Sequence, residues 1–117
     1  MAEVLIYHNP NCSTSKHAVA LAESLGVDAE VNLYLRTKPD RAELEALLTK
    51  LEDPPSDLVR RDAFFAEQGL TDADVATPDA VIDVLVRHPR LLQRPVLVRG
   101  DRAIIGRPKD RVEPFLS

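Results

Sequence analysis

The chain has 117 residues, of which 44% are hydrophobic and 29% are charged, and its net charge is −4. This size and composition predict one globular domain over residues 1–117 and exclude an intrinsically disordered chain. No apolar run approaches the roughly 20 residues of a membrane span, and the N-terminus carries no basic-then-apolar signal peptide pattern. A single cysteine excludes an internal disulfide. We therefore expect a cytoplasmic protein.

The N-terminal part of the chain predicts two strands joined by a helix. Residues 3–7, with an apolar run from residue 4 to residue 7, predict a strand, and residues 8–11 form an Asn/Pro-rich loop. Residues 13–25 repeat apolar side chains at helical spacing. Gly26 supplies a stop signal for that helix, and alternating apolar residues predict a second strand over residues 29–35. A crossover of this length favours parallel strands in a right-handed βαβ unit.

The middle of the chain predicts helices. Asp40 can cap the first of them, and Glu43 lies at the capping-box distance from it. Ser56 is the expected cap of a short helix that carries residues 58–61, and Thr77 begins a third helix with a proline at its first position. The apolar residues expected to face the core are Leu44, Leu47, Leu48 and Leu51 in the first helix and Val81, Val84 and Leu85 in the third.

After these helices the apolar spacing changes from a helical period to an alternation. The alternation predicts strands over residues 96–98 and 102–105, joined by a turn at Gly100-Asp101, and a short terminal helix over residues 109–115 follows. The predicted order is therefore βαβ, a helical insertion over about residues 40–90, and then ββα.

Cys12 is the only cysteine, and it lies where the first predicted strand and loop meet the first helix. Free backbone N–H groups and the helix dipole favour an anion at a helix N-terminus, and nearby cations lower a thiol pKa. His8 and Lys16 flank the position. We expect Cys12 to act as a thiolate nucleophile; the alternative is a buried cysteine that packs as a small apolar side chain.

Basic residues are concentrated towards the C-terminal end. Residues 87–111 hold eight basic and two acidic side chains, a local charge of +6, which leaves −10 for the remainder of a chain whose total is −4. Seven of the eight are arginines, which suit planar, bidentate binding of oxyanions, although a solvated basic face is the alternative. Nucleic acid is the weaker ligand because the chain is acidic overall and has few aromatic residues.

A strand–loop–Cys–helix unit followed by a hairpin and a terminal helix resembles the thioredoxin-like arrangement, an α/β fold with a mixed four-stranded sheet. That fold normally places a cis X-Pro bond opposite the active cysteine, just before the hairpin. Arg94-Pro95 occupies this position, and only an X-Pro bond makes a cis peptide energetically accessible, so we predict that it is cis. A trans proline at the start of a strand is the alternative.

Seven short segments, in order along the whole chain, carry a resemblance to a known family. They are His8-Asn9-Pro10-x-Cys12-x-x-Ser15, Leu33-Tyr34-Leu35, Leu58-Val59-Arg60, Gln68-Gly69-Leu70, His88-Pro89, Arg94-Pro95-Val96 and Ile105-Gly106-Arg107-Pro108. Each is weak alone, but their joint order and spacing resemble the glutaredoxin-coupled arsenate reductase family, including its short paralogues. The resemblance implies that Cys12 is the nucleophile that attacks arsenic(V), that His8 favours the thiolate, and that the Ser15 hydroxyl hydrogen-bonds to it.

Three further positions match the arginines that bind the oxyanion in that family: Arg60, Arg94 and Arg107. Arsenate repels an incoming thiolate, so its attack requires cations that neutralise the oxyanion. Arg61 is the neighbouring candidate, but adjacent helical residues point about 100° apart, so we expect only one of the pair to reach the site. Tyr7 and Tyr34 are interpreted as core packing, and a place for Tyr7 in the lining of the cysteine pocket is the alternative.

A single thiol cannot complete a two-electron reduction by itself. The resemblance implies glutathione, or another low-molecular-weight thiol, as the co-substrate that attacks the Cys12 adduct, and glutaredoxin as the partner that reduces the mixed intermediate. We expect a monomer with no bound cofactor and no nucleic acid or membrane partner. We also expect no metal site, because His17 and His88 lack the partners and spacing of metal ligands.

Two other functions are compatible with this fold. One is reduction of another thiol-linked substrate by a paralogue, although the arginine trio favours an oxyanion over an uncharged disulfide. The other is regulation: Spx-type proteins resemble the family and bind RNA polymerase, but they usually carry Cys-x-x-Cys where this chain has Cys12-x-x-Ser15. Arsenate reduction is the leading prediction.

Overall fold

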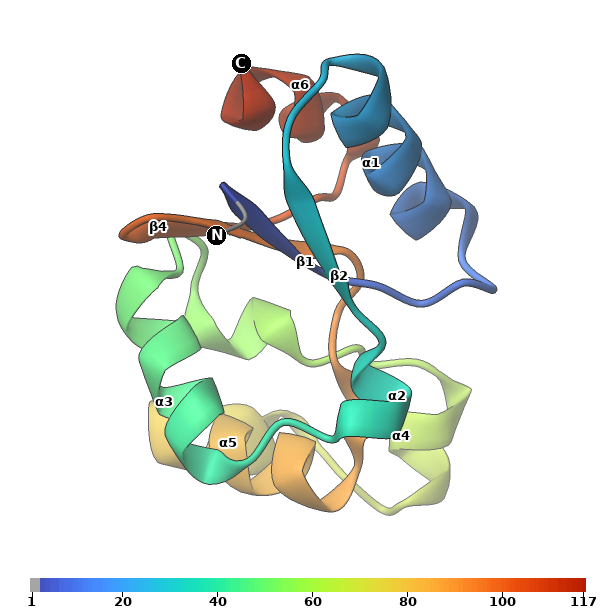
Figure 1. Cartoon of the computed structure of the whole chain (residues 1–117). Helices are drawn as coiled ribbons and strands as arrows, with labels where there is room; N and C mark the ends of the chain where they lie inside the picture. The colour runs from blue at the N-terminus through green and yellow to red at the C-terminus, as the bar shows by residue number, and fades with distance from the viewer. Residues whose placement is uncertain (1–2) are drawn as a thin grey trace.

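The centre of the fold is a four-stranded mixed sheet in the computed structural model, which describes residues 3–117 (Figure 1). Residues 1–2, with which the predicted domain begins, lie outside the described residues. The strands are β1 (Val4–Tyr7), β2 (Ala29–Asn32), β3 (Val96–Arg99) and β4 (Arg102–Ile105). Their order is β2-β1-β3-β4, with β1 parallel to β2 and antiparallel to β3, and with β3 and β4 forming a hairpin. The predicted thioredoxin-like mixed sheet and its parallel βαβ unit are confirmed.

Helices cover both faces of this sheet (Figure 1). On one face α1 (Ser13–Ser24) lies beside α6 (Val112–Leu116), which follows a 3₁₀ turn at Lys109–Arg111 and confirms the predicted terminal helix. The segment between β2 and β3 covers the other face. Its elements are α2 (Tyr34–Thr37), α3 (Arg41–Lys50), α4 (Ala63–Glu67), α5 (Pro78–Arg87) and 3₁₀ turns at Pro55–Leu58, Asp72–Val75 and Pro89–Leu91. Among residues 3–117, no helix combines the length and apolarity that a membrane crossing requires.

Alternate side chains of β1 belong to two separate cores. Val4 and Ile6 pack with Ala18 of α1, whereas Tyr7 packs with the helical segment on the opposite face. Because both faces of β1 are covered, its sequence is a continuous apolar run. Full burial of a large apolar side chain stabilises the fold by roughly 1.5–3 kcal/mol. This packing fixes the end of β1, from which the loop to Cys12 departs.

The predicted helix starts at Asp40 and Thr77 are confirmed. Asp40 accepts the Glu43 N–H at 2.9 Å, and the Thr77 hydroxyl accepts the Ala80 N–H at 3.1 Å. The carboxylate of Glu43 does not complete a capping box, because it accepts the Tyr7 hydroxyl at 2.7 Å. That bond ties α3 to the end of β1.

The second strand is shorter than predicted. The expected strand over residues 29–35 ends at Asn32, because the Leu33 carbonyl accepts two N–H groups from the following turn, at 2.8 and 3.1 Å, and α2 begins there. β2 is also an edge strand, so its apolar alternation does not follow burial, and Val31 is 40% exposed.

The helix predicted to begin at Ser56 does not reach Arg60. Its 3₁₀ turn ends before Val59, which pairs with Leu92 in an isolated antiparallel bridge, and the Arg60 N–H donates to the Leu91 carbonyl oxygen at 2.7 Å. Pairing with a segment far along the chain therefore overrides the local helix signal. As a result, Arg60 lies outside any helix.

Candidate active site

Cys12 is the N-cap residue of α1, as predicted, with extended backbone angles of φ −110° and ψ 123°. The loop before it is closed by its own hydrogen bonds: the Asn9 side-chain oxygen accepts the Asn11 N–H at 2.9 Å, and the Asn9 carbonyl accepts the Cys12 N–H at 3.1 Å. The Cys12 residue is 8% exposed. Cys12 is therefore held at the first turn of the helix, largely out of solvent.

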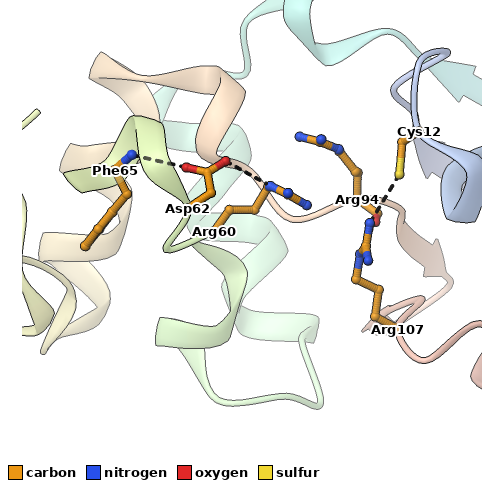
Figure 2. Close-up of polar contacts among 6 residues, drawn as sticks. All are labelled: Cys12, Arg60, Asp62, Phe65, Arg94 and Arg107. Carbon is orange, nitrogen blue, oxygen red and sulfur yellow. Dashed lines mark hydrogen bonds and ion pairs between the residues drawn. The ribbon is translucent and has the colours of Figure 1, made fainter. Parts of the chain in front are cut away.

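Arg94 and Arg107 flank the β3–β4 hairpin, and Figure 2 shows the Arg107 side chain extending to Cys12 while that of Arg94 extends towards Arg60. Since Arg94 precedes β3 and Arg107 follows β4, antiparallel pairing brings both to the same end of the sheet. Arg107 Nη2 donates to Cys12 Sγ at 3.2 Å, and its Nε donates to the Arg94 carbonyl oxygen at 2.8 Å. The peptide bond Arg94-Pro95 is cis, which confirms the prediction, and a second cis bond, Arg107-Pro108, was not predicted.

Gly106 allows the two ends of this hairpin to approach closely. Its N–H donates to the Pro95 carbonyl oxygen at 2.8 Å. A Cβ at this position would lie 2.7 Å from Pro95 Cγ and 3.0 Å from Leu97 Cδ1, well inside the roughly 3.5–4.0 Å of a relaxed carbon contact. Only glycine fits there without displacing the ring of Pro95, which directly follows Arg94.

The surroundings of Cys12 favour its thiolate form. Burial alone would raise the pKa of Cys12, but the backbone N–H groups of Ser15 and Thr14, a hydrogen bond from Arg94 and the positive charge of Arg107 together lower it. The first turn of a helix and two guanidiniums thus act in the same direction. This supports the prediction of a thiolate.

His8 and Ser15 contact each other beneath the cysteine loop. His8 Nδ1 and Ser15 Oγ are 2.6 Å apart, and the same hydroxyl oxygen accepts the Asn9 N–H at 3.0 Å. Burial and then the positive charge of Lys16 lower the pKa of His8, so its imidazole is neutral near pH 7 and can accept the Ser15 hydroxyl proton at Nδ1. The expected bond from the Ser15 hydroxyl to Cys12 is not formed between these described residues; the backbone N–H of Ser15 faces the thiol instead.

Arg60 approaches from the helical segment, and Figure 2 shows its side chain extending towards that of Arg94. Its Nε lies 3.4 Å from Asp62 Oδ2, and the other oxygen of Asp62 accepts the Phe65 N–H at 3.1 Å, so that Asp62 also caps α4. Asp62 has no place in the sequence-based prediction, although an aspartate just before a short apolar helix is a usable cap signal. It orients Arg60 along the direction of the site.

Arg61 is directed elsewhere. Its guanidinium nitrogens lie 3.9 Å from carboxylate oxygens of Asp57 and Asp72. Only one of the two adjacent arginines therefore extends to the site, as expected, but the predicted reason is wrong. Arg60 and Arg61 lie outside any helix, and their carboxylate partners separate them: Arg60 contacts Asp62, whereas Arg61 faces the other two aspartates.

Tyr34 is buried, as is Tyr7, but their hydroxyl groups differ. The Tyr7 hydroxyl donates to Glu43. The Tyr34 hydroxyl and Arg94 Nε are both buried and have no hydrogen-bond partner within the described part of the chain, residues 3–117. The interpretation of Tyr34 as simple core packing therefore missed a polar atom at the site. The sequence around Tyr34 carried no signal for this role of its hydroxyl group.

These residues combine a thiol of lowered pKa with three guanidiniums and several N–H donors. Such an arrangement can bind an oxyanion next to a nucleophile, since arginine forks match paired oxygens and do not deprotonate. Within residues 3–117 there is no cluster of three or more His, Cys, Asp or Glu side chains suited to a metal ion. The chemistry that the site supports is attack by sulfur on a bound anion.

A model of the ArsC family matches residues 7–115, a span that includes all six predicted site residues. This chain belongs to the ArsC family. Membership confirms the family resemblance inferred from the seven short segments, and it agrees with the position of the cysteine at the start of α1 in a thioredoxin-like sheet.

ArsC relatives match this chain over nearly its whole length. A Neisseria meningitidis protein called "Arsenate reductase" is 37% identical over 99% of this chain and 100% of its own. An Escherichia coli protein called "Uncharacterized protein YfgD" is 38% identical over 94% of this chain and 93% of its own. Among solved structures, "Arsenate reductase from Vibrio cholerae" has a TM-score of 0.84 at 34% identity and covers 95% of each chain.

Proposed function

We propose that the protein reduces arsenate to arsenite with external thiols, and that Cys12 is its nucleophile. The observation that carries the proposal is the 3.2 Å contact between Arg107 Nη2 and Cys12 Sγ, because it joins a thiol of lowered pKa to a side chain suited to oxyanions. The relatives named arsenate reductase support arsenate, rather than another oxyanion, as the substrate.

In the first step the Cys12 thiolate attacks arsenic(V). An S–As bond forms, an As–O bond breaks, and the departing oxygen leaves as water, so the oxidation state of arsenic does not change. Arsenate is anionic near neutral pH and repels a thiolate. The positive charges of Arg60, Arg94 and Arg107 offset that repulsion as the two approach.

The reduction itself requires two electrons, and the chain has one thiol. Glutathione, or another low-molecular-weight thiol, replaces a second oxygen on arsenic, which again leaves as water. A glutaredoxin thiolate then attacks the glutathione sulfur, a disulfide forms between these two, and the electron pair of the broken As–S bond stays on arsenic as arsenic(III). Water releases arsenite from Cys12, which returns as a thiol.

His8 and Ser15 act as positioning residues in this scheme. The Ser15 hydroxyl links the His8 ring to the Asn9 N–H and so holds the loop against the first turn of α1. This keeps the Ser15 and Thr14 N–H groups directed at Cys12, where they lower its pKa.

The test is arsenite production from arsenate with glutathione and glutaredoxin, in which wild type is compared with Cys12→Ser. Ser24→Ala, at the far end of α1, is the control for a small change in that helix. Activity in wild type and Ser24→Ala but not in Cys12→Ser is the expected result. A wild type that forms no arsenite with any of several thiols would contradict the proposal and point to another thiol-linked substrate or to a partner-binding role.

A further inference from the structure

Two buried polar atoms of the site, the Tyr34 hydroxyl oxygen and Arg94 Nε, have no hydrogen-bond partner within residues 3–117. We call these two atoms the donor pair. Tyr34 is 0% exposed. Buried polar atoms in folded proteins are nearly always hydrogen-bonded. Tyr7 shows the ordinary arrangement in the same core, because its hydroxyl donates to Glu43 at 2.7 Å. The donor pair therefore requires a specific explanation.

The donor pair lies on the arginine side of the site. The Asn9 and Arg94 side chains approach the Tyr34 oxygen as donors and lower its pKa, as do the charges of Arg94 and Arg60, but neither side chain completes a hydrogen bond to it. Figure 2 shows the side chains of Arg60 and Arg94 extending towards each other in this region. Tyr34 is fixed by its backbone, since it begins α2 and its carbonyl accepts the Lys38 N–H at 2.9 Å.

What the donor pair lacks is an acceptor. The Nε of an arginine can only donate. Burial raises the pKa of Tyr34 even though Arg94 opposes it, so the phenol keeps its proton at neutral pH and is also able to donate. One oxygen of a tetrahedral oxyanion has lone pairs for two donors at once, and its negative charge strengthens both hydrogen bonds.

We propose that Tyr34 is a further oxyanion-binding residue: its hydroxyl and Arg94 Nε donate hydrogen bonds to one oxygen of a bound tetrahedral oxyanion. The identity of that oxyanion as arsenate rests on the proposed function. The three arginines supply charge, whereas Tyr34 supplies a neutral donor in a fixed direction. It therefore orients the oxyanion in front of Cys12 without adding to the mutual repulsion of the guanidiniums.

Two tyrosine-to-phenylalanine variants form a matched pair for the test. Tyr34→Phe removes one member of the donor pair, so the unliganded protein loses a buried unsatisfied group and its Tm should be unchanged or higher. Tyr7→Phe removes a satisfied hydroxyl on the same core and leaves Glu43 without it, so its Tm should fall. The pair separates oxyanion binding from packing.

Binding is measured by titration calorimetry with arsenate and with sulfate, in a Cys12→Ser background where no reduction occurs. We expect Tyr34→Phe to weaken binding of both anions roughly tenfold or more, and Tyr7→Phe to leave it unchanged. Unchanged affinity in Tyr34→Phe would overturn the inference. A loss of affinity accompanied by a fall in Tm as large as that of Tyr7→Phe would overturn it too, because the role would then be structural.

The experiments distinguish a failure of the inference about Tyr34 from a failure of the proposed function. Sulfate is not reduced by thiols, so weaker sulfate binding by Tyr34→Phe would support oxyanion binding even if wild type formed no arsenite. Conversely, a wild type that reduces arsenate while Tyr34→Phe has the same KM and affinity would leave the proposed function intact and refute the role of Tyr34.

Discussion

Gly106→Ala tests whether the hairpin geometry sets the reactivity of Cys12. The added Cβ would stand 2.7 Å from Pro95 Cγ and 3.0 Å from Leu97 Cδ1, and relaxed carbon contacts are about 3.5–4.0 Å. The proline ring is rigid, so the backbone at this point has to move by roughly 1 Å. Overpacking of this kind destabilises a protein by about 1–3 kcal/mol.

The displacement reaches the site because Arg107 follows Gly106 directly. Arg107 Nη2 is 3.2 Å from Cys12 Sγ, and moving it by roughly 1 Å would remove that hydrogen bond. A misplacement of this size can lower a rate by about a hundredfold. We expect Gly106→Ala to lower kcat/KM for arsenate by about 10- to 100-fold and to slow alkylation of Cys12 by iodoacetamide at neutral pH.

Gly100→Ala is the matched control. Gly100 lies in the β3–β4 turn at φ +61°, and among residues 3–117 no atom would contact its added Cβ within 4 Å. Alanine there strains the backbone by about 1–2 kcal/mol without reaching the site. Urea unfolding should show a loss of stability in both variants, whereas activity and alkylation should fall only in Gly106→Ala. Equal activity and equal alkylation rates in the two would refute the reasoning.

Two further predictions concern the arginines and the thiol. Arg60→Gln should raise the KM for arsenate at least about tenfold, because a charge-assisted contact is lost, while Arg61→Gln should leave the KM unchanged. Both values are measured by steady-state kinetics, and equal effects of the two substitutions would contradict the different directions of the two side chains. The pH midpoint of Cys12 alkylation should lie below that of an unperturbed thiol, since its pKa is lowered although burial opposes this, and Arg107→Gln should move the midpoint upward. The sign for stability follows: ionised Cys12 stabilises the folded state above the unfolded-state pKa, and this contribution is lost as the pH falls through the lower, folded-state value. A midpoint that Arg107→Gln does not move would exclude Arg107 as a cause.

Most of the fold follows from local signals. The caps at Asp40 and Thr77, the loop before Cys12 and the turn at Gly100-Asp101 each act within a few residues, and each lies where the sequence predicts it. The side chains of β3 and β4 alternate between the two cores, as the alternating sequence pattern also predicts. A fold whose sheet is assembled from such elements is accessible to pattern analysis.

The parts that could not be predicted depend on distant pairing or on individual atoms. Arg60 lies outside a helix because the chain pairs there with Leu91 and Leu92, which no local pattern indicates. The Ser15 hydroxyl bonds to His8 and accepts the Asn9 N–H rather than facing Cys12, a choice of partner that depends on the positions of individual atoms. The hydroxyl of Tyr34 has the same sequence signal as a packed aromatic ring, so only the position of its oxygen distinguishes it.

The contact between Arg107 and Cys12 joins residues 95 positions apart in the chain. Arg94 and Arg107, in contrast, belong to one hairpin and can come together early, because a short loop closes at little entropic cost. Cys12 meets them only in the assembled sheet, where β1 lies between β2 and β3. The lowered pKa of this one thiol is therefore a property of the assembled sheet, and we expect the thiol of an unfolded chain to titrate as an ordinary cysteine.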